Sequence, residues 1–85
     1  MQSVSMHIET STIGDVPQSF FELGLACSTG REGQVDLVEA HKWFNIAAAR
    51  GDRVAAERRE EIAGEMSREE IAAALRAARE WISLH

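Results

Sequence analysis

Apolar residues recur every three or four positions in four separate stretches of this chain, and glycine, acidic or hydroxyl residues stand between the stretches. This spacing is typical of amphipathic α-helices. The first helix is expected to begin at Pro17, because the fixed φ of proline suits a first turn, and to end before Gly30 and Gly33. Its apolar positions are Phe20, Phe21, Leu23, Gly24 and Cys27.

The second and third predicted helices lie on either side of Gly51, which can adopt the positive φ of a helix end. The second spans 37–50 with Asp36 as its N-cap, and the third spans 53–65 with Asp52 as its N-cap. The apolar face of the second helix consists of Ala40, Trp43, Phe44, Ala47 and Ala48. The third carries the apolar residues Val54, Ala55, Ile62 and Ala63, and its other face has charges of both signs, which predicts a solvated surface.

The fourth predicted helix begins at Ser67, where Glu70 three residues later completes a capping box, and ends near Ser83. Its apolar stripe is Ile71, Leu75, Ala78 and Ile82, with Trp81 beside it. The short connections between the helices are those expected of adjacent antiparallel helices. The sequence therefore predicts an all-α fold of about four antiparallel helices. The residues expected to dominate its core are Leu23, Trp43, Phe44, Leu75 and Trp81.

Residues 1–16 are expected to form a flexible N-terminal tail, because polar residues dominate them. Val4, Met6 and Ile8 alternate with polar positions, so a short strand is the alternative for this segment. A lone strand has no partner elsewhere in the chain, and it would have to pair with a second copy.

The composition narrows the range of functions. Nine basic and fourteen acidic residues give a net charge of −5, which argues against a general affinity for nucleic acid. The single cysteine cannot form an internal disulfide, residues 1–17 lack a secretory signal, and no stretch approaches the ~18 apolar residues of a membrane helix. We therefore expect a cytoplasmic protein that binds neither membrane nor nucleic acid.

The residue types that carry chemistry are scattered. His7, His41 and His85 lack the spacing of a metal site and are expected to be lone surface histidines. Cys27 lies on an apolar helical face, which favours a packed small hydrophobe over a reactive thiol. A chain of 85 residues also has little room for a pocket of ~300 Å³ or more. We expect no catalytic residue, no metal and no cofactor.

One set of positions carries a family resemblance: Leu23, Gly24, Gly30, Gly33, Asp36, Ala40, Trp43, Phe44, Ala47, Ala48 and Gly51. Their spacing resembles one Sel-one-like repeat, a relative of the tetratricopeptide repeat. The resemblance implies a short α-solenoid, with a helix–turn–helix repeat at 17–51 and a partial repeat with a capping helix at 52–85, the last two helices forming a capping hairpin. It also implies a non-catalytic protein–protein interaction module, such as a small adaptor or scaffold.

Only one complete repeat is present, although at least ~3 such units normally build a continuous core. Adjacent helical positions point about 100° apart, so we expect only one of Phe20 and Phe21 to face the second helix. The other is then left for a partner or for the N-terminal tail, which would keep the chain monomeric by folding back over it. The predicted protein-binding residues are Phe20, Phe21 and Glu22, and the predicted partner is another protein or a second copy of the chain, giving a homodimer.

A small DNA-binding regulator of helix-turn-helix type is the alternative function. Residues 67–75 resemble the opening of such a domain. A reader helix with basic or amide side chains should follow this opening, whereas the chain stays apolar and helical through Trp81. The interaction module is therefore the favoured prediction.

Overall fold

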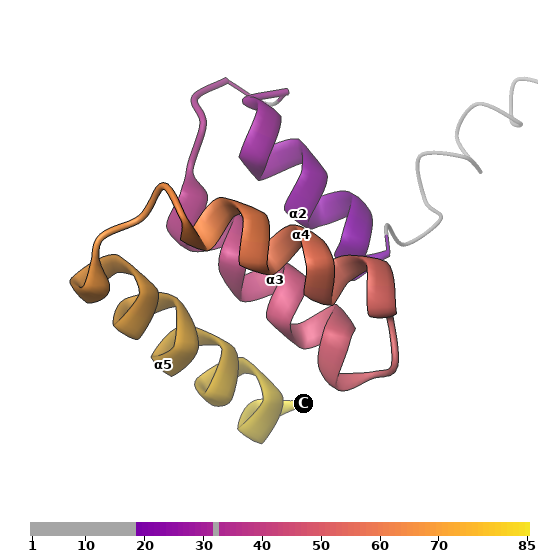
Figure 1. Ribbon diagram of the computed structural model, residues 1–85. Coiled ribbons are helices and arrows are strands. Elements are labelled where there is room, and N and C mark those ends of the chain that lie inside the picture. The colour runs from indigo at the N-terminus through magenta and orange to yellow at the C-terminus, as the bar shows by residue number, and fades with distance from the viewer. Residues whose placement is uncertain (1–18, 32) are drawn as a thin grey trace, which may run out of the picture.

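The computed structural model describes residues 19–31 and 33–85, and these residues form four helices and no strand. The helices are α2 (Phe20–Thr29), α3 (Leu37–Ala49), α4 (Arg53–Ala63) and α5 (Arg68–Leu84) (Figure 1). The fold of this part is thus all-α with four helices, as predicted. The expectations for the tail at 1–16 and its alternative strand lie outside the described residues.

Side-chain caps begin all four helices. The side chains of Ser19, Asp36 and Asp52 each accept a hydrogen bond from the backbone N–H three residues later. The capping box is confirmed, because the Ser67 hydroxyl accepts from the Glu70 N–H at 3.0 Å while the Glu70 carboxylate accepts from the Ser67 N–H at 2.8 Å. The first helix starts at Phe20 with Ser19 as its cap, so the expected start at Pro17 was wrong.

Glycine ends two helices through positive φ. Gly30 has φ 76° at the C-cap of α2, where its N–H bonds the carbonyl of Ala26 at 3.1 Å. Gly51 has φ 100° directly after α3 and allows the chain to reverse into α4. The third helix ends at Ala63 rather than near residue 65. Residues 64–66 form a turn instead, in which each backbone N–H donates to the carbonyl three residues earlier.

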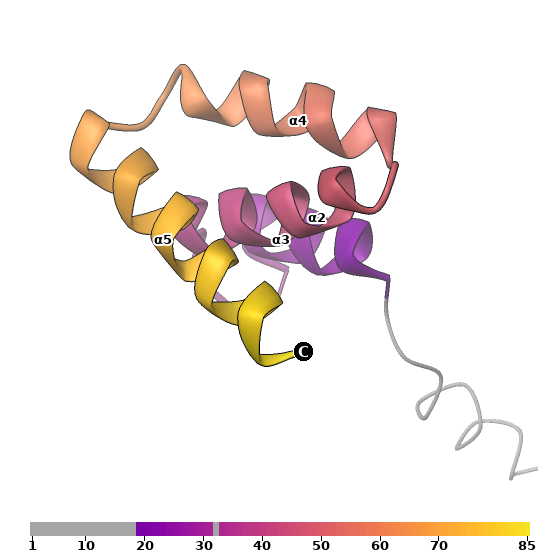
Figure 2. The same cartoon turned by 90° about the horizontal axis from the view of Figure 1, so that it is seen from below.

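The central element is α3, and α2, α4 and α5 each pack against it (Figures 1 and 2). In Figure 2 the helices α4 and α5 diverge from the turn that joins them, and they scarcely contact each other. The predicted C-terminal capping hairpin is therefore wrong. The physical reason lies in α4: Ala55 and Ile62 contact the core around α3, and most of the remaining side chains of the helix are charged and exposed.

The core is built around Phe44, which is 1% exposed. Buried alanines surround it, and half-buried apolar side chains close it from α2 and α4. Gly24 makes the close approach of α2 possible, since a Cβ at this position would lie 2.5 Å from Cε1 of Phe44. The members of this cluster are Ala40, Phe44, Ala47, Ala55, Phe20, Phe21, Leu25, Cys27 and Ile62.

Burial departs from the expected core in a consistent way. Of the five predicted core residues only Phe44 is fully buried, and Leu23, Trp43, Leu75 and Trp81 are half-buried. Ile82, a member of the predicted apolar stripe of the last helix, is 42% exposed. The helix α5 buries Ala74 and Ala78 most completely, and helices that approach through alanines leave larger neighbours at the edge of the contact.

Candidate functional site

Three aromatic rings from three different helices meet at one place on the molecule. Phe20 at the start of α2 stacks on Trp43 of α3 with 5.9 Å between ring centroids and planes 4° apart. Trp81 of α5 meets Phe20 edge-on at 5.1 Å and Trp43 edge-on at 5.8 Å. All three side chains are only half-buried. We call Phe20, Trp43 and Trp81 the aromatic patch.

The arrangement of the helices explains why the rings converge. Since α2 and α5 both pack on α3, the first residue of α2 and the last turn of α5 come together over the same side of α3. His85 extends the stack, with its ring 4.1 Å from that of Trp81 and nearly parallel to it. The patch is thus a continuous set of ring faces and edges that is partly open to solvent.

Two cations lie over these rings. The ammonium of Lys42 is 4.0 Å from the ring centroid of Trp43. The guanidinium of Arg50 lies 5.0 Å from the ring of Phe20 and 5.5 Å from the ring of Trp81. Contacts of this kind attract a cation to the negative face of an aromatic ring. The patch is therefore aromatic at its centre and positively charged at two points of its edge.

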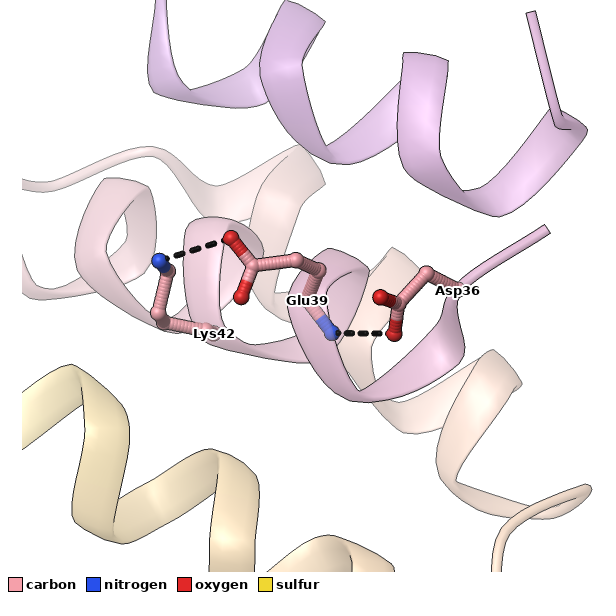
Figure 3. A network of polar contacts seen from close by, with 3 residues as sticks. All are labelled: Asp36, Glu39 and Lys42. Carbon is pink, nitrogen blue, oxygen red and sulfur yellow. Dashed lines mark hydrogen bonds and ion pairs between the residues drawn. The ribbon is translucent and has the colours of Figure 1, made fainter. Parts of the chain in front are cut away.

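The two cations differ in their acidic partners. Figure 3 shows Asp36, Glu39 and Lys42 in succession: Asp36 accepts from the Glu39 N–H at 3.0 Å, and the Glu39 carboxylate pairs with Lys42 at 2.8 Å. Across residues 19–31 and 33–85, by contrast, no carboxylate pairs with Arg50. The charge of Lys42 is compensated, and that of Arg50 is held against ring faces alone.

Exposed aliphatic side chains continue the surface along the last turn of α5. Leu84 is 79% exposed and Ile82 is 42% exposed. Leu84 stands three positions after Trp81, a spacing that places both on the same side of a helix. Apolar area next to the patch is therefore open to solvent.

The predicted binding residues Phe20, Phe21 and Glu22 do not form one surface. Phe21 points inward, where its ring lies 5.7 Å from that of Phe44, and Glu22 lies on α2 about 200° around the axis from Phe20. The expectation that only one phenylalanine could face α3 was wrong. Adjacent positions on α3 also point about 100° apart. The ring of Phe20 therefore meets that of Trp43, and the ring of Phe21 meets that of Phe44.

The remaining chemical candidates are dispersed. No three His, Cys, Asp or Glu side chains of the described residues come close enough to hold a metal ion. Cys27 is half-buried against the core cluster. His85 is exposed and His7 lies outside the described residues, but His41 is only 3% exposed, so the expectation of a surface histidine was wrong there. Burial lowers the pKa of His41 and the charge of Arg59 lowers it further.

Sequence reasoning missed most of this site. It treated Trp43 and Trp81 as core residues and gave no role to Arg50. A usable signal was present, because Arg50 follows Trp43 by seven positions, which is two helical turns, and so shares its side of the helix. The pairing with Trp81 depends on how α5 crosses α3, and no local pattern encodes that.

The fold and this surface define a small all-α chain with an aromatic patch at the meeting point of three helices. No protein-family model matches the chain, and no curated protein or solved structure matches it either. Within residues 19–31 and 33–85, none of the helices has the length and apolar run needed to cross a membrane.

Proposed function

We propose that this chain is a non-catalytic protein–protein interaction module that contacts its partner through the aromatic patch and Leu84. The observation that carries the proposal is the exposure of large side chains at one place: three half-buried rings from α2, α3 and α5, continued by a leucine that is 79% exposed. Aromatic and arginine side chains dominate the binding energy of protein interfaces. Rings fixed by their neighbours also lose little conformational entropy when a partner covers them.

Two sequence features, the family resemblance and the charge, support the same class of function, and a third indicates the compartment. The motif positions of α2 and α3 resemble a Sel-one-like helix pair, and the proposal retains that resemblance as its family assignment. The single cysteine of the chain fits the reducing cytoplasm, which the proposal takes as the compartment. A protein partner is favoured over nucleic acid by the net charge of −5 and by the exposure of Glu57, Arg58 and Glu61 on α4, where both signs are mixed.

A homodimer remains one form that the interaction could take. The sequence predicts it from an uncovered phenylalanine on α2, whereas in the structure Phe20 packs on Trp43 and Trp81 and Phe21 packs on Phe44. The proposal therefore assigns the surface to a separate protein. Sedimentation of the purified chain at rising concentration separates the two cases, since a dimer that Leu84→Glu dissociates would identify a second copy as the partner.

Affinity capture with matched variants tests the proposal. The bait is the full chain, and the variants are Leu84→Glu at the patch and Val54→Glu on α4, where Val54 is 51% exposed. Both changes add one negative charge at an exposed position, so both should keep the helical circular dichroism of the parent. We expect the same partner protein with the parent and with Val54→Glu, and at least tenfold less with Leu84→Glu. Equal recovery with both variants would contradict the proposal.

A further inference from the structure

Arg50 is the cation of the aromatic patch that lies over two rings and has no acidic partner among the described residues. Its guanidinium lies over the rings of Phe20 and Trp81 at 5.0 and 5.5 Å and makes no side-chain hydrogen bond or ion pair to any residue within 19–31 and 33–85. The other cation over the patch differs, because Lys42 pairs with the Glu39 carboxylate at 2.8 Å. Arg50 is also exposed to solvent.

The chemistry of the guanidinium determines what Arg50 can bind. The group carries five N–H donors in one plane, and no acceptor among the described side chains takes any of them. These donors match the two oxygens of a carboxylate. The two rings also restrict the position of the guanidinium, so less side-chain entropy is lost when an acid binds.

Apolar surface lies within reach of the same site. Trp81 contacts Arg50 through its ring, and Leu84, which follows Trp81 by three positions, is 79% exposed. A ligand that places a carboxylate on Arg50 can therefore place a neighbouring apolar side chain on Leu84 and on the part of Trp81 that the stacked His85 ring leaves exposed. An acid alone would leave the leucine exposed, and an apolar group alone would leave the donors of Arg50 in water.

We infer that the aromatic patch recognises a protein segment in which an acidic side chain is next to a large apolar one, with the acid on Arg50 and the apolar side chain on Trp81 and Leu84. This inference rests on the proposed function and adds the chemistry of the partner. Charge complementarity selects the occupant, because the described surface supplies a positive group with no acid of its own.

The chain contains a built-in reporter for this binding. It has two tryptophans and no tyrosine, and both tryptophans, Trp43 and Trp81, belong to the patch. Its intrinsic emission therefore comes from the proposed site. The probes are short acetylated peptides, free of tryptophan and tyrosine, with a central Glu-Phe or Glu-Leu pair, and matched peptides with glutamine in place of glutamate.

We expect the glutamate peptides to change the tryptophan emission of the full chain and to bind about tenfold more tightly than their glutamine counterparts, because a charge-assisted hydrogen bond contributes about this factor. Arg50→Gln should remove this preference, while Arg53→Gln, at an exposed arginine of α4, should keep it. Leu84→Glu should weaken both kinds of peptide. The exchange of glutamate for glutamine is made in the ligand, so this comparison does not depend on how any variant folds.

Several results would overturn the inference. Equal affinity for glutamate and glutamine peptides would show that no acid is recognised, and a preference for glutamate that survives Arg50→Gln would show that Arg50 does not bind the acid. In either case peptide binding that still depends on Leu84 would leave the proposed function intact. The proposed function itself would fail if Leu84→Glu and Val54→Glu captured the partner equally well.

Two other results would assign the patch to a different occupant. Tighter peptide binding by Glu9→Gln or Asp15→Asn would assign Arg50 to an acid of the same chain, and a dimer dissociated by Leu84→Glu would assign the patch to a second copy.

Discussion

Replacing Gly24 with alanine should destabilise the chain, although alanine is the better helix former. A Cβ at this position would lie 2.5 Å from Cε1 and 2.6 Å from Cδ1 of Phe44. The ring cannot easily move away, because Phe44 is 1% exposed and is also packed against the ring of Phe21. The added methyl group must therefore displace α2 from α3 or force the ring out of its preferred position.

Two opposing terms set the size of the effect. Overpacking a well-filled core costs about 1–3 kcal/mol, and the fixed ring of Phe44 places this site near the upper end, at about 3 kcal/mol. Exchanging glycine for alanine inside a helix stabilises it by about 1 kcal/mol. The net expectation is a loss of about 2 kcal/mol, which for a domain of this size lowers Tm by roughly 10 °C.

Thermal and urea unfolding followed by circular dichroism measure this loss. Gly64→Ala is the matched control, since a Cβ there would meet only the carbonyl oxygen of Glu61 at 3.4 Å and its φ of −64° suits any residue. We expect the control to stay within about 0.5 kcal/mol of the parent. A Gly24→Ala variant as stable as the parent, or more stable, would refute the close packing of α2 on α3.

Three further predictions test separate parts of the structure. Phe44→Ala should cost about 3–5 kcal/mol because it empties the centre of the core, and Trp43→Ala should cost clearly less because Trp43 is half-buried; equal losses in urea unfolding would contradict this order. The lowered pKa of His41 means that the unfolded chain binds a proton before the folded one does, so stability should be greatest above about pH 6.5 and fall as the pH drops toward the folded pKa. His41→Gln should flatten this pH dependence and His85→Gln should not, and an unchanged profile for His41→Gln would rule out His41 as its source. Ser67→Ala should cost about 1 kcal/mol by removing the hydroxyl that caps α5, and an unchanged urea midpoint would show that this cap is dispensable.

Local signals predicted the local structure. The caps at Asp36, Asp52 and Ser67 and the positive φ of Gly51 follow from side-chain chemistry within a few residues, and the structure confirms all of them. The first helix begins at Phe20 rather than at Pro17, because the Ser19 side chain caps it. Local chemistry thus fixes where helices begin and end.

How deeply each side chain is buried was less predictable, because burial depends on which residues form the contact where two helices cross. Ranking residues by size predicted Trp43 and Trp81 to be buried, whereas α5 packs through Ala74 and Ala78, and both tryptophans are only half-buried. The divergence of α4 from α5 also depends on tertiary packing. The aromatic patch exists only because of these departures, so only its member on α2, Phe20, could be predicted as a binding residue.

The central claim, that the patch is the partner-binding surface, is tested most directly by site-specific photo-crosslinking in the source cell. A photoreactive phenylalanine analogue at position 84 is compared with the same analogue at position 54, since Leu84 and Val54 are both exposed and lie on different helices. The account predicts a discrete crosslinked product with another protein from position 84, little or none from position 54, and loss of the product when Arg50→Gln is added. Equal crosslinking from the two positions, or a product from position 54 alone, would contradict it.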